Sequence, residues 1–271
     1  MKSLQLKVLS VVASALAVVG VAVAPQATAA ERNLVAFGDS VLADPDAGSY
    51  LAHRYDPSKG VGVDCPTSNN YAKRAGAKLR LPVRDFSCSG AVSMSRGPQI
   101  FQQVDAAIRT GALSPATNRV VITTGFNDTY NHRDMSLPQI RKEFADRTAP
   151  QIERIKRAAP NARVQIVGYP TIGTGPYYCL FHFGPRPADS TFLPGIQDFE
   201  NKAQWMQVDL AARTGVQFLD MKPSTRNNGM CADANQRMWA GLVDFTAGDG
   251  NLPIHMNQRG HEHAANVIAR S

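Results

Sequence analysis

Two residues far apart in the chain have the types needed for covalent ester chemistry. Ser40, in the run Gly38-Asp39-Ser40, offers a hydroxyl, and His255, in a polar run near the C-terminus, offers an imidazole. A serine hydroxyl becomes an effective nucleophile when a neighbouring base accepts its proton. We therefore interpret Ser40 as the candidate nucleophile and His255 as its candidate base.

Two further residues could stabilise the negative charge that such an attack creates. Gly90 ends the run Ser87-Cys88-Ser89-Gly90, and its backbone N–H can approach a ligand closely because glycine has no side chain. Asn127 adds a side-chain amide donor. Together with the backbone N–H of Ser40, these groups could form an oxyanion hole. Each motif alone is typical of a turn or a helix cap, so the hypothesis depends on their order after successive strands.

The elements that must position these residues follow an alternating pattern. Short apolar segments bounded by turn residues predict strands, and segments with apolar residues three or four apart predict helices. The alternation predicts a parallel sheet covered on both faces, with the ligand site at the carboxyl ends of the strands. The predicted strands are 33–37, 83–86, 119–124, 163–168 and 216–219, and the predicted helices are 70–79, 100–108, 137–158, 196–214 and 258–269.

Two segments depart from this regular alternation. Pro150 lies inside the helix predicted over 137–158, where we expect it to kink the helix or to begin a second one. Residues 169–194 have no periodicity but are rich in glycine, proline and aromatic residues. A loop of this length is usually functional, and it could either pack on the body of the protein or form an apolar wall beside the site.

The first 29 residues have the composition of a secretory signal peptide. Lys2 and Lys7 precede an apolar run, and Ala27-Thr28-Ala29 supplies small residues where a peptidase would cut. We expect residues 1–29 to be removed and residues 30–271 to form one exported domain. Loss of the two lysines lowers the formal net charge from +7 to +5. The remaining basic residues form no stripe with interleaved aromatics, so we expect no nucleic-acid partner.

Four cysteines, an even number, remain in the exported chain. In an oxidising compartment this favours two disulfides. Three pairings are possible, and we predict Cys65–Cys88 with Cys179–Cys231 because these bridges close the shorter loops. The chain has no C-x-x-C pair, and the spacing of His255, His261 and His263 fits no zinc pattern well, so we expect no metal and no cofactor. We expect His261 to pack near the last helix or to cap it.

The four motifs together resemble those of the secreted SGNH (GDSL-type) hydrolases. The resemblance rests on Phe37-Gly38-Asp39-Ser40, Gly90, Gly125-x-Asn127-Asp128 and His255, and it spans roughly residues 33 to 265. It implies that residues 30–271 form a flavodoxin-like three-layer α/β/α sandwich. It also implies an ester hydrolase with Ser40 as nucleophile, His255 as base, and Ser40, Gly90 and Asn127 as oxyanion donors.

The chain departs from the family pattern at one position. The family usually has an aspartate three residues before the histidine, and Leu252 stands there. The backbone carbonyl of Leu252 could orient His255, which would give a serine–histidine dyad. Alternatively, Asp249 or Asp244 could fold back as the acid. We favour the carbonyl because its position is fixed by the chain.

The predicted function is a secreted lipase or esterase that acts on a small-molecule or lipid ester as a monomer. The same site could transfer the acyl group to an alcohol or act on a cell-wall or glycolipid ester. The chain could also be an inactive exported binding domain. Transient contact with lipid or cell wall stays open.

Overall fold

The computed structural model describes residues 31–56, 58–60, 62, 64–248 and 252–271. The predicted signal peptide, residues 1–29, and the candidate acid Asp249 lie outside the described residues. Within the described part of the chain, no helix is both long and apolar enough to cross a membrane.

Five parallel strands form the central sheet, as the alternation predicts. Their order is β2-β1-β3-β4-β8, so β1 and β3 lie side by side near the middle. Both of these strands are completely buried, which explains why they are almost continuously apolar. The strands are β1 (Leu34–Gly38), β2 (Val83–Asp85), β3 (Arg119–Thr123), β4 (Arg163–Val167) and β8 (Gln217–Leu219).

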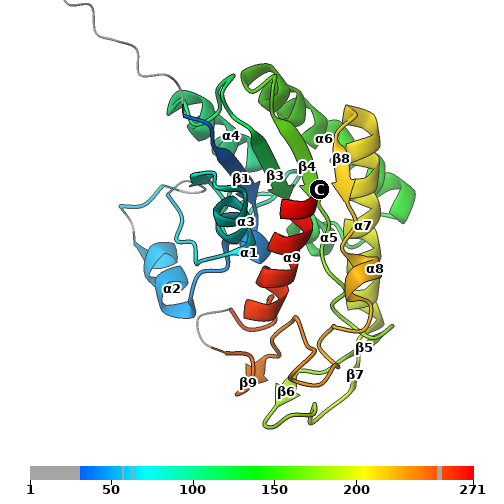
Figure 1. Cartoon of the computed structure of the whole chain (residues 1–271). Helices are drawn as coiled ribbons and strands as arrows, with labels where there is room; N and C mark the ends of the chain where they lie inside the picture. Colours follow the sequence, from blue (N-terminus) through cyan, green and yellow to red (C-terminus); the bar gives the residue numbers. More distant parts are fainter. Residues whose placement is uncertain (1–30, 57, 61, 63, 249–251) are drawn as a thin grey trace, which may run out of the picture.

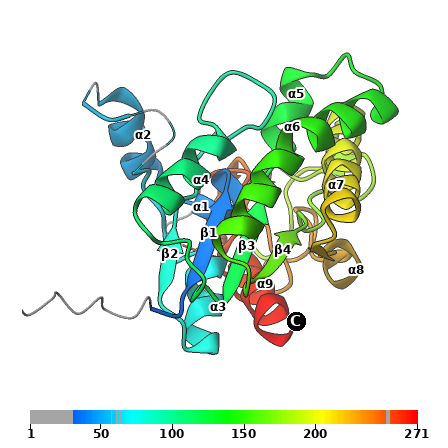
Figure 2. The same ribbon diagram turned by 90° about the horizontal axis from the view of Figure 1, so that it is seen from above.

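Helices cover both faces of this sheet and complete the expected three layers (Figures 1 and 2). Successive strand residues point to opposite faces. Leu34 and Ala36 accordingly pack in a core with α3 (Tyr71–Leu79) and α9 (Gln258–Arg270). The alternate strand residues pack in a second core with three other helices, α4 (Ile100–Arg109), α6 (Leu137–Ala158) and α7 (Pro194–Thr214).

Helix α6 runs through Pro150 as one helix, so a second helix does not begin there. A proline in a helix interior costs about 3 kcal/mol. The apolar face of α6 continues beyond Pro150, where Ile152 and Ile155 are fully buried against the sheet. Burial of each such side chain stabilises the fold by roughly 1.5–3 kcal/mol, which offsets the cost.

Short elements collect at the carboxyl edge of the sheet. The aperiodic segment over residues 169–194 contains three two-residue strands, and one of them pairs with a strand near residue 243. The remaining elements are α1 (Ser40–Ala43), α2 (Ala47–Tyr55), α5 (Phe126–Asn131), β5 (Tyr177–Tyr178), β6 (Phe181–His182), β7 (Thr191–Phe192), α8 (Lys222–Thr225) and β9 (Val243–Asp244).

Both predicted disulfides are confirmed. Cys65 bonds to Cys88, and Cys179 bonds to Cys231, with Cα–Cα distances of 5.2 and 4.9 Å. All four cysteines lie in loops rather than in helices or strands. The bridges therefore join loops to one another and leave the sheet and its helices without a covalent tie.

Removal of either disulfide should destabilise the protein by an amount that grows with the logarithm of the length of the loop that it closes. The sequence separations are 23 and 52 residues, for which loop-closure entropy predicts losses of about 3 and about 4 kcal/mol. Urea unfolding of Cys65→Ala/Cys88→Ala and of Cys179→Ala/Cys231→Ala, monitored by circular dichroism, measures both values. Losses below about 1 kcal/mol for both variants would contradict the chain-entropy account.

Candidate active site

Ser40 lies where β1 ends and α1 begins. The chain turns sharply there because Asp39 caps the helix: its carboxylate accepts a hydrogen bond from the Val41 N–H at 2.9 Å. The Asp39 N–H continues the sheet by donating to the Thr123 carbonyl at 3.0 Å. Ser40 therefore begins a helix, and the N–H groups of a first turn have no acceptor within the helix.

His255 meets Ser40 directly. Its Nε2 lies 2.8 Å from the Ser40 Oγ, although the two residues are 215 positions apart. Its Nδ1 lies 2.8 Å from the Pro253 carbonyl oxygen. A carbonyl can only accept, so Nδ1 carries the proton and donates it to Pro253. Nε2 is then left as an acceptor for the Ser40 hydroxyl, as a base requires.

The backbone acceptor differs from the expected one by one residue. The carbonyl that faces Nδ1 belongs to Pro253 rather than to Leu252. Asp244 does not take the part of an acid for His255, because its carboxylate accepts hydrogen bonds from Arg237 at 2.8 and 2.9 Å and from the Gly241 N–H.

A strained residue explains why the neighbouring carbonyl is used. Ile254 has a φ of +54°, a conformation that β-branched residues rarely adopt. Backbone hydrogen bonds hold this turn on both sides: the Ile254 N–H donates to Gly241, and the His255 carbonyl accepts from Ala240 at 2.7 Å. Such a conformation costs about 1–3 kcal/mol and is common at functional sites. The turn brings the Pro253 carbonyl back to the imidazole.

The surroundings of His255 favour its neutral form. Burial lowers the pKa of His255 below its ordinary value of 6.5, and the nearby His261 lowers it further. The Pro253 carbonyl and the Asp44 carboxylate act in the opposite direction without cancelling this effect. At neutral pH the imidazole can therefore accept a proton.

Gly90 and Asn127 line the same cavity as Ser40 and His255. Gly90 has a φ of +80°, and a Cβ built on it would meet no atom within 4 Å, so this stretch of backbone is open to a ligand. The Asn127 amide donates to the Ala91 carbonyl at 2.9 Å, which joins α5 to the loop that carries Gly90. The structure thus brings all four predicted site residues to one edge of the sheet.

Asp128 also holds the Gly90 loop, a role that the sequence did not indicate. Its buried carboxylate accepts hydrogen bonds from the backbone N–H groups of Ser93, Met94 and Ser95 at 2.8–3.1 Å. Burial raises the pKa of Asp128 above its ordinary value, against the opposing effect of these hydrogen bonds. The residue after Asn127 therefore fixes the segment that follows Gly90.

Tyr169 connects the nucleophile turn to α5. Its hydroxyl donates a short hydrogen bond to the Asp39 carboxylate and accepts one from the Phe126 N–H at 3.0 Å. Burial raises the pKa of Asp39 to about 7, although the bonds from Tyr169 and Val41 oppose this shift. The role of this hydroxyl could not be predicted from the sequence, because no local pattern links Tyr169 to Asp39.

The cavity over these residues has a volume of about 530 Å³ and mostly apolar walls. The aperiodic segment contributes to it, as one of the two interpretations expects, and it also packs into the core through Tyr178 and Cys179. Both interpretations of this segment are therefore correct in part. The apolar side chains that line the cavity include Phe126, Ile172, Leu180, Leu193, Ile196, Met230, Trp239, Leu242, Leu252 and Ile254.

The C-terminal histidines do not converge on a common point. His255 faces Ser40, His261 lies 2.9 Å from the Asp44 carboxylate, and the His263 Nε2 lies 2.9 Å from the Ser224 hydroxyl. Among the described residues, no group of three or more His, Cys, Asp or Glu side chains could hold a metal ion.

Comparison with models of protein families finds a match over most of the chain. A model of the GDSL-like lipase/acylhydrolase family matches residues 36–263. No curated protein sequence matches the chain.

Solved structures show the same fold at low sequence identity. Phospholipase A1 from Streptomyces albidoflavus superposes with a TM-score of 0.56 at 19% identity, covering 88% of this chain and 99% of that one. A lipase/acylhydrolase from Enterococcus faecalis gives 0.50 at 15% identity, with coverage of 88% and 94%. The carbohydrate acetylesterase Est24 from Sinorhizobium meliloti gives 0.50 at 15% identity, with coverage of 89% and 97%.

The buried Asp39 should make stability depend on pH. Its pKa is about 7 in the folded protein and 3.8 in the unfolded chain, so the folded state retains a proton that the unfolded state releases. The contribution of Asp39 to stability therefore decreases as the pH rises from about 4 to about 7, by up to roughly 4 kcal/mol. Asp39→Asn should remove this dependence. The difference between the unfolding free energy of the variant and that of the wild type should therefore increase, in favour of the variant, between pH 5 and pH 8.

Urea unfolding at the two pH values measures this gain. Asp134→Asn, at a fully exposed carboxylate, serves as the control and should follow the wild type at both. If the Asp39→Asn and wild-type curves run parallel with pH, Asp39 does not hold the extra proton.

Proposed function

Because the chain belongs to the GDSL-like lipase/acylhydrolase family, we propose that it is a secreted serine ester hydrolase. The observation that carries this proposal is the 2.8 Å contact between the Ser40 Oγ and the His255 Nε2, with Nδ1 bound to a backbone carbonyl. This arrangement activates a hydroxyl without requiring a carboxylate in contact with the histidine.

The reaction would proceed through an acyl-enzyme. The Ser40 Oγ attacks the ester carbonyl carbon while the His255 Nε2 takes the hydroxyl proton. The ester oxygen becomes an oxyanion, which the N–H groups of Ser40 and Gly90 and the Asn127 amide would stabilise. The intermediate collapses, and the imidazolium gives its proton to the departing alcohol. Water, activated by His255 in the same way, then releases the acid and restores Ser40.

The Pro253 carbonyl has a defined part in this cycle. It fixes the imidazole ring with Nε2 toward Ser40, and its partial negative charge stabilises the imidazolium that forms during each proton transfer. A backbone acceptor provides the orientation that a triad aspartate would provide, with less charge.

The cavity supports an ester with an apolar acyl group as substrate. Its walls are formed mainly by aliphatic and aromatic side chains, and its polar lining includes Ser40, Ser89, Asn127 and His255. An acyl chain could occupy the apolar part while its carbonyl lies at the polar end. Two structural neighbours are named as a phospholipase A1 and a lipase/acylhydrolase, and these names are consistent with an acyl ester as substrate.

Export is supported by the sequence and by the disulfides. Residues 1–29 have the pattern of a signal peptide, and two disulfides suit an oxidising compartment. We propose that residues 30–271 act outside the cytoplasm as one domain.

Ser40→Ala should abolish turnover of p-nitrophenyl esters because no other group would form the acyl-enzyme. His255→Ala should lower turnover by at least about 1,000-fold. Matched controls are Ser89→Ala, which removes another hydroxyl from the same cavity, and His263→Ala, which removes a histidine bound to Ser224. Both controls should retain most activity. Undiminished turnover in folded Ser40→Ala would refute the proposed function.

The apolar cavity should also make the rate depend on acyl chain length. Each buried methylene is worth about 0.8 kcal/mol, so kcat/KM should rise about threefold to fourfold per added methylene until the cavity is filled. A series of p-nitrophenyl esters from acetate to laurate measures this, with Ser89→Ala as the control for a changed cavity polarity. A steady preference for acetate would instead indicate a deacetylase that leaves the cavity to another part of the substrate.

A further inference from the structure

A fully buried carboxylate lies directly behind the candidate base. Asp44 follows α1, one turn after Ser40, and its backbone N–H donates to the Ser40 carbonyl at 2.9 Å. Its side chain is completely inaccessible to solvent. Its φ of +43° turns the chain away from the helix at this point, a conformation that aspartate tolerates better than most residues.

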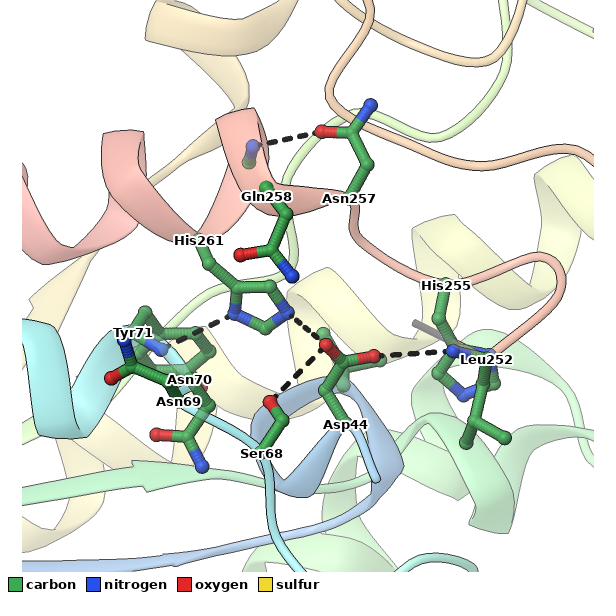
Figure 3. A network of polar contacts seen from close by, with 12 residues as sticks. Asp44, Ser68, Asn69, Asn70, Tyr71, Leu252, His255, Asn257, Gln258 and His261 are labelled. Atoms are coloured by element: carbon green, nitrogen blue, oxygen red, sulfur yellow. Dashed lines mark hydrogen bonds and ion pairs between the residues drawn. The ribbon is translucent and has the colours of Figure 1, made fainter. Parts of the chain in front are cut away.

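Three donors from three separate segments face this carboxylate (Figure 3). The Leu252 N–H lies 3.4 Å from Oδ1, the Ser68 hydroxyl lies 3.4 Å from Oδ2, and the His261 Nε2 lies 2.9 Å from Oδ2. Leu252 is three residues before His255, so the first of these contacts reaches the loop that carries the base.

The state of His261 follows from its other ring nitrogen. The Tyr71 N–H donates to the His261 Nδ1 at 3.2 Å, so Nδ1 is an acceptor and the ring proton is on Nε2, facing Asp44. The ring is fully buried and stacks on Tyr71 with a centroid distance of 5.8 Å. Among the described residues, the three groups that face Asp44 can each present a proton to it, as suits a carboxylate.

We propose that Asp44 is the positioning residue of His255, and that it supplies from behind the loop the negative charge that a triad aspartate supplies by direct contact. The role of the third triad member is then divided. The Pro253 carbonyl takes the hydrogen bond from Nδ1, and Asp44 contributes the charge and holds the loop through Leu252. The inference rests on the proposed roles of Ser40 and His255.

The electrostatic balance around His255 agrees with this division. Burial and His261 lower the pKa of His255, whereas the Pro253 carbonyl and the Asp44 carboxylate raise it. Among the described residues, these groups act on the imidazole from α9, from the loop over residues 252–255 and from the end of α1. A negative charge at Asp44 stabilises the imidazolium that forms when Ser40 loses its proton.

Asp44→Asn tests the proposal because it keeps the shape and removes the charge. We expect kcat for p-nitrophenyl esters to fall roughly 10- to 100-fold, less than the about 10,000-fold loss on replacing a directly bonded triad aspartate. KM should change little, since Asp44 does not line the cavity. The His255 pKa should fall, so the acid limb of the kcat/KM profile should move to lower pH. A residue with a purely structural role would not produce that shift.

Two control variants separate charge from packing. Asp244→Asn also removes a buried carboxylate, but one bound to Arg237, and should cost stability without moving the acid limb. His261→Gln removes the ring that faces Asp44 but keeps the Asp44 carboxylate, so it should not move the limb to lower pH. A shift to lower pH in both Asp44→Asn and His261→Gln would indicate general loosening and overturn the proposal.

A direct titration makes the result independent of turnover. In a Ser40→Ala background, NMR of ¹⁵N-histidine should show a lower His255 titration midpoint when Asp44→Asn is added. If Ser40→Ala proves fully active, the proposed function itself fails. If Ser40→Ala is inactive, but Asp44→Asn keeps the wild-type kcat and the wild-type midpoint, only the role of Asp44 is refuted.

Discussion

The close contact between β1 and β3 at Gly38 is the constraint on which the site depends. A Cβ at this position would lie 2.6 Å from the Thr123 carbonyl oxygen, so no side chain fits. Both backbone groups of Gly38 are bound by the buried Gln103 side chain, at 2.8 and 2.9 Å. The backbone at the end of β1 is therefore held in a single conformation. The turn through Asp39 then places Ser40 at the start of α1, outside the sheet.

Buried aspartates then extend that rigidity to the loops. Asp39, Asp44 and Asp128 are each essentially inaccessible to solvent, and each accepts hydrogen bonds from a different part of the chain. Asp39 binds the hydroxyl that also reaches α5, Asp128 binds the loop after Gly90, and Asp44 binds the loop before His255. Burying a carboxylate is costly, and its cost is offset only when several donors converge on it. The loops that supply those donors are thereby held in place.

Features of the site that depend on neighbouring residues in the sequence could be predicted, whereas features that depend on contacts between distant segments could not. Ser40, Gly90 and Asn127 could be placed from sequence because each follows a recognisable strand, and parallel strands bring their carboxyl ends together. The role of the Pro253 carbonyl could not be predicted, because a β-branched residue such as Ile254 gives no indication in the sequence that its φ is positive. The pairing of Asp44 with His261 depends on how α9 packs against α3 and so brings His261 to the end of α1, which no local pattern encodes. Pro150 misleads for the same reason: its helix continues because of tertiary burial.

The placement of the disulfides separates folding from the assembly of the pocket. Cys88 is two residues from Gly90, and Cys179 and Cys231 adjoin the cavity residues Leu180 and Met230. The sheet and its helices hold no cysteine, so a chain kept under reducing conditions can form its framework while the cavity walls lack their covalent ties. A change of redox conditions would then alter the order of the cavity walls before it alters the order of the sheet.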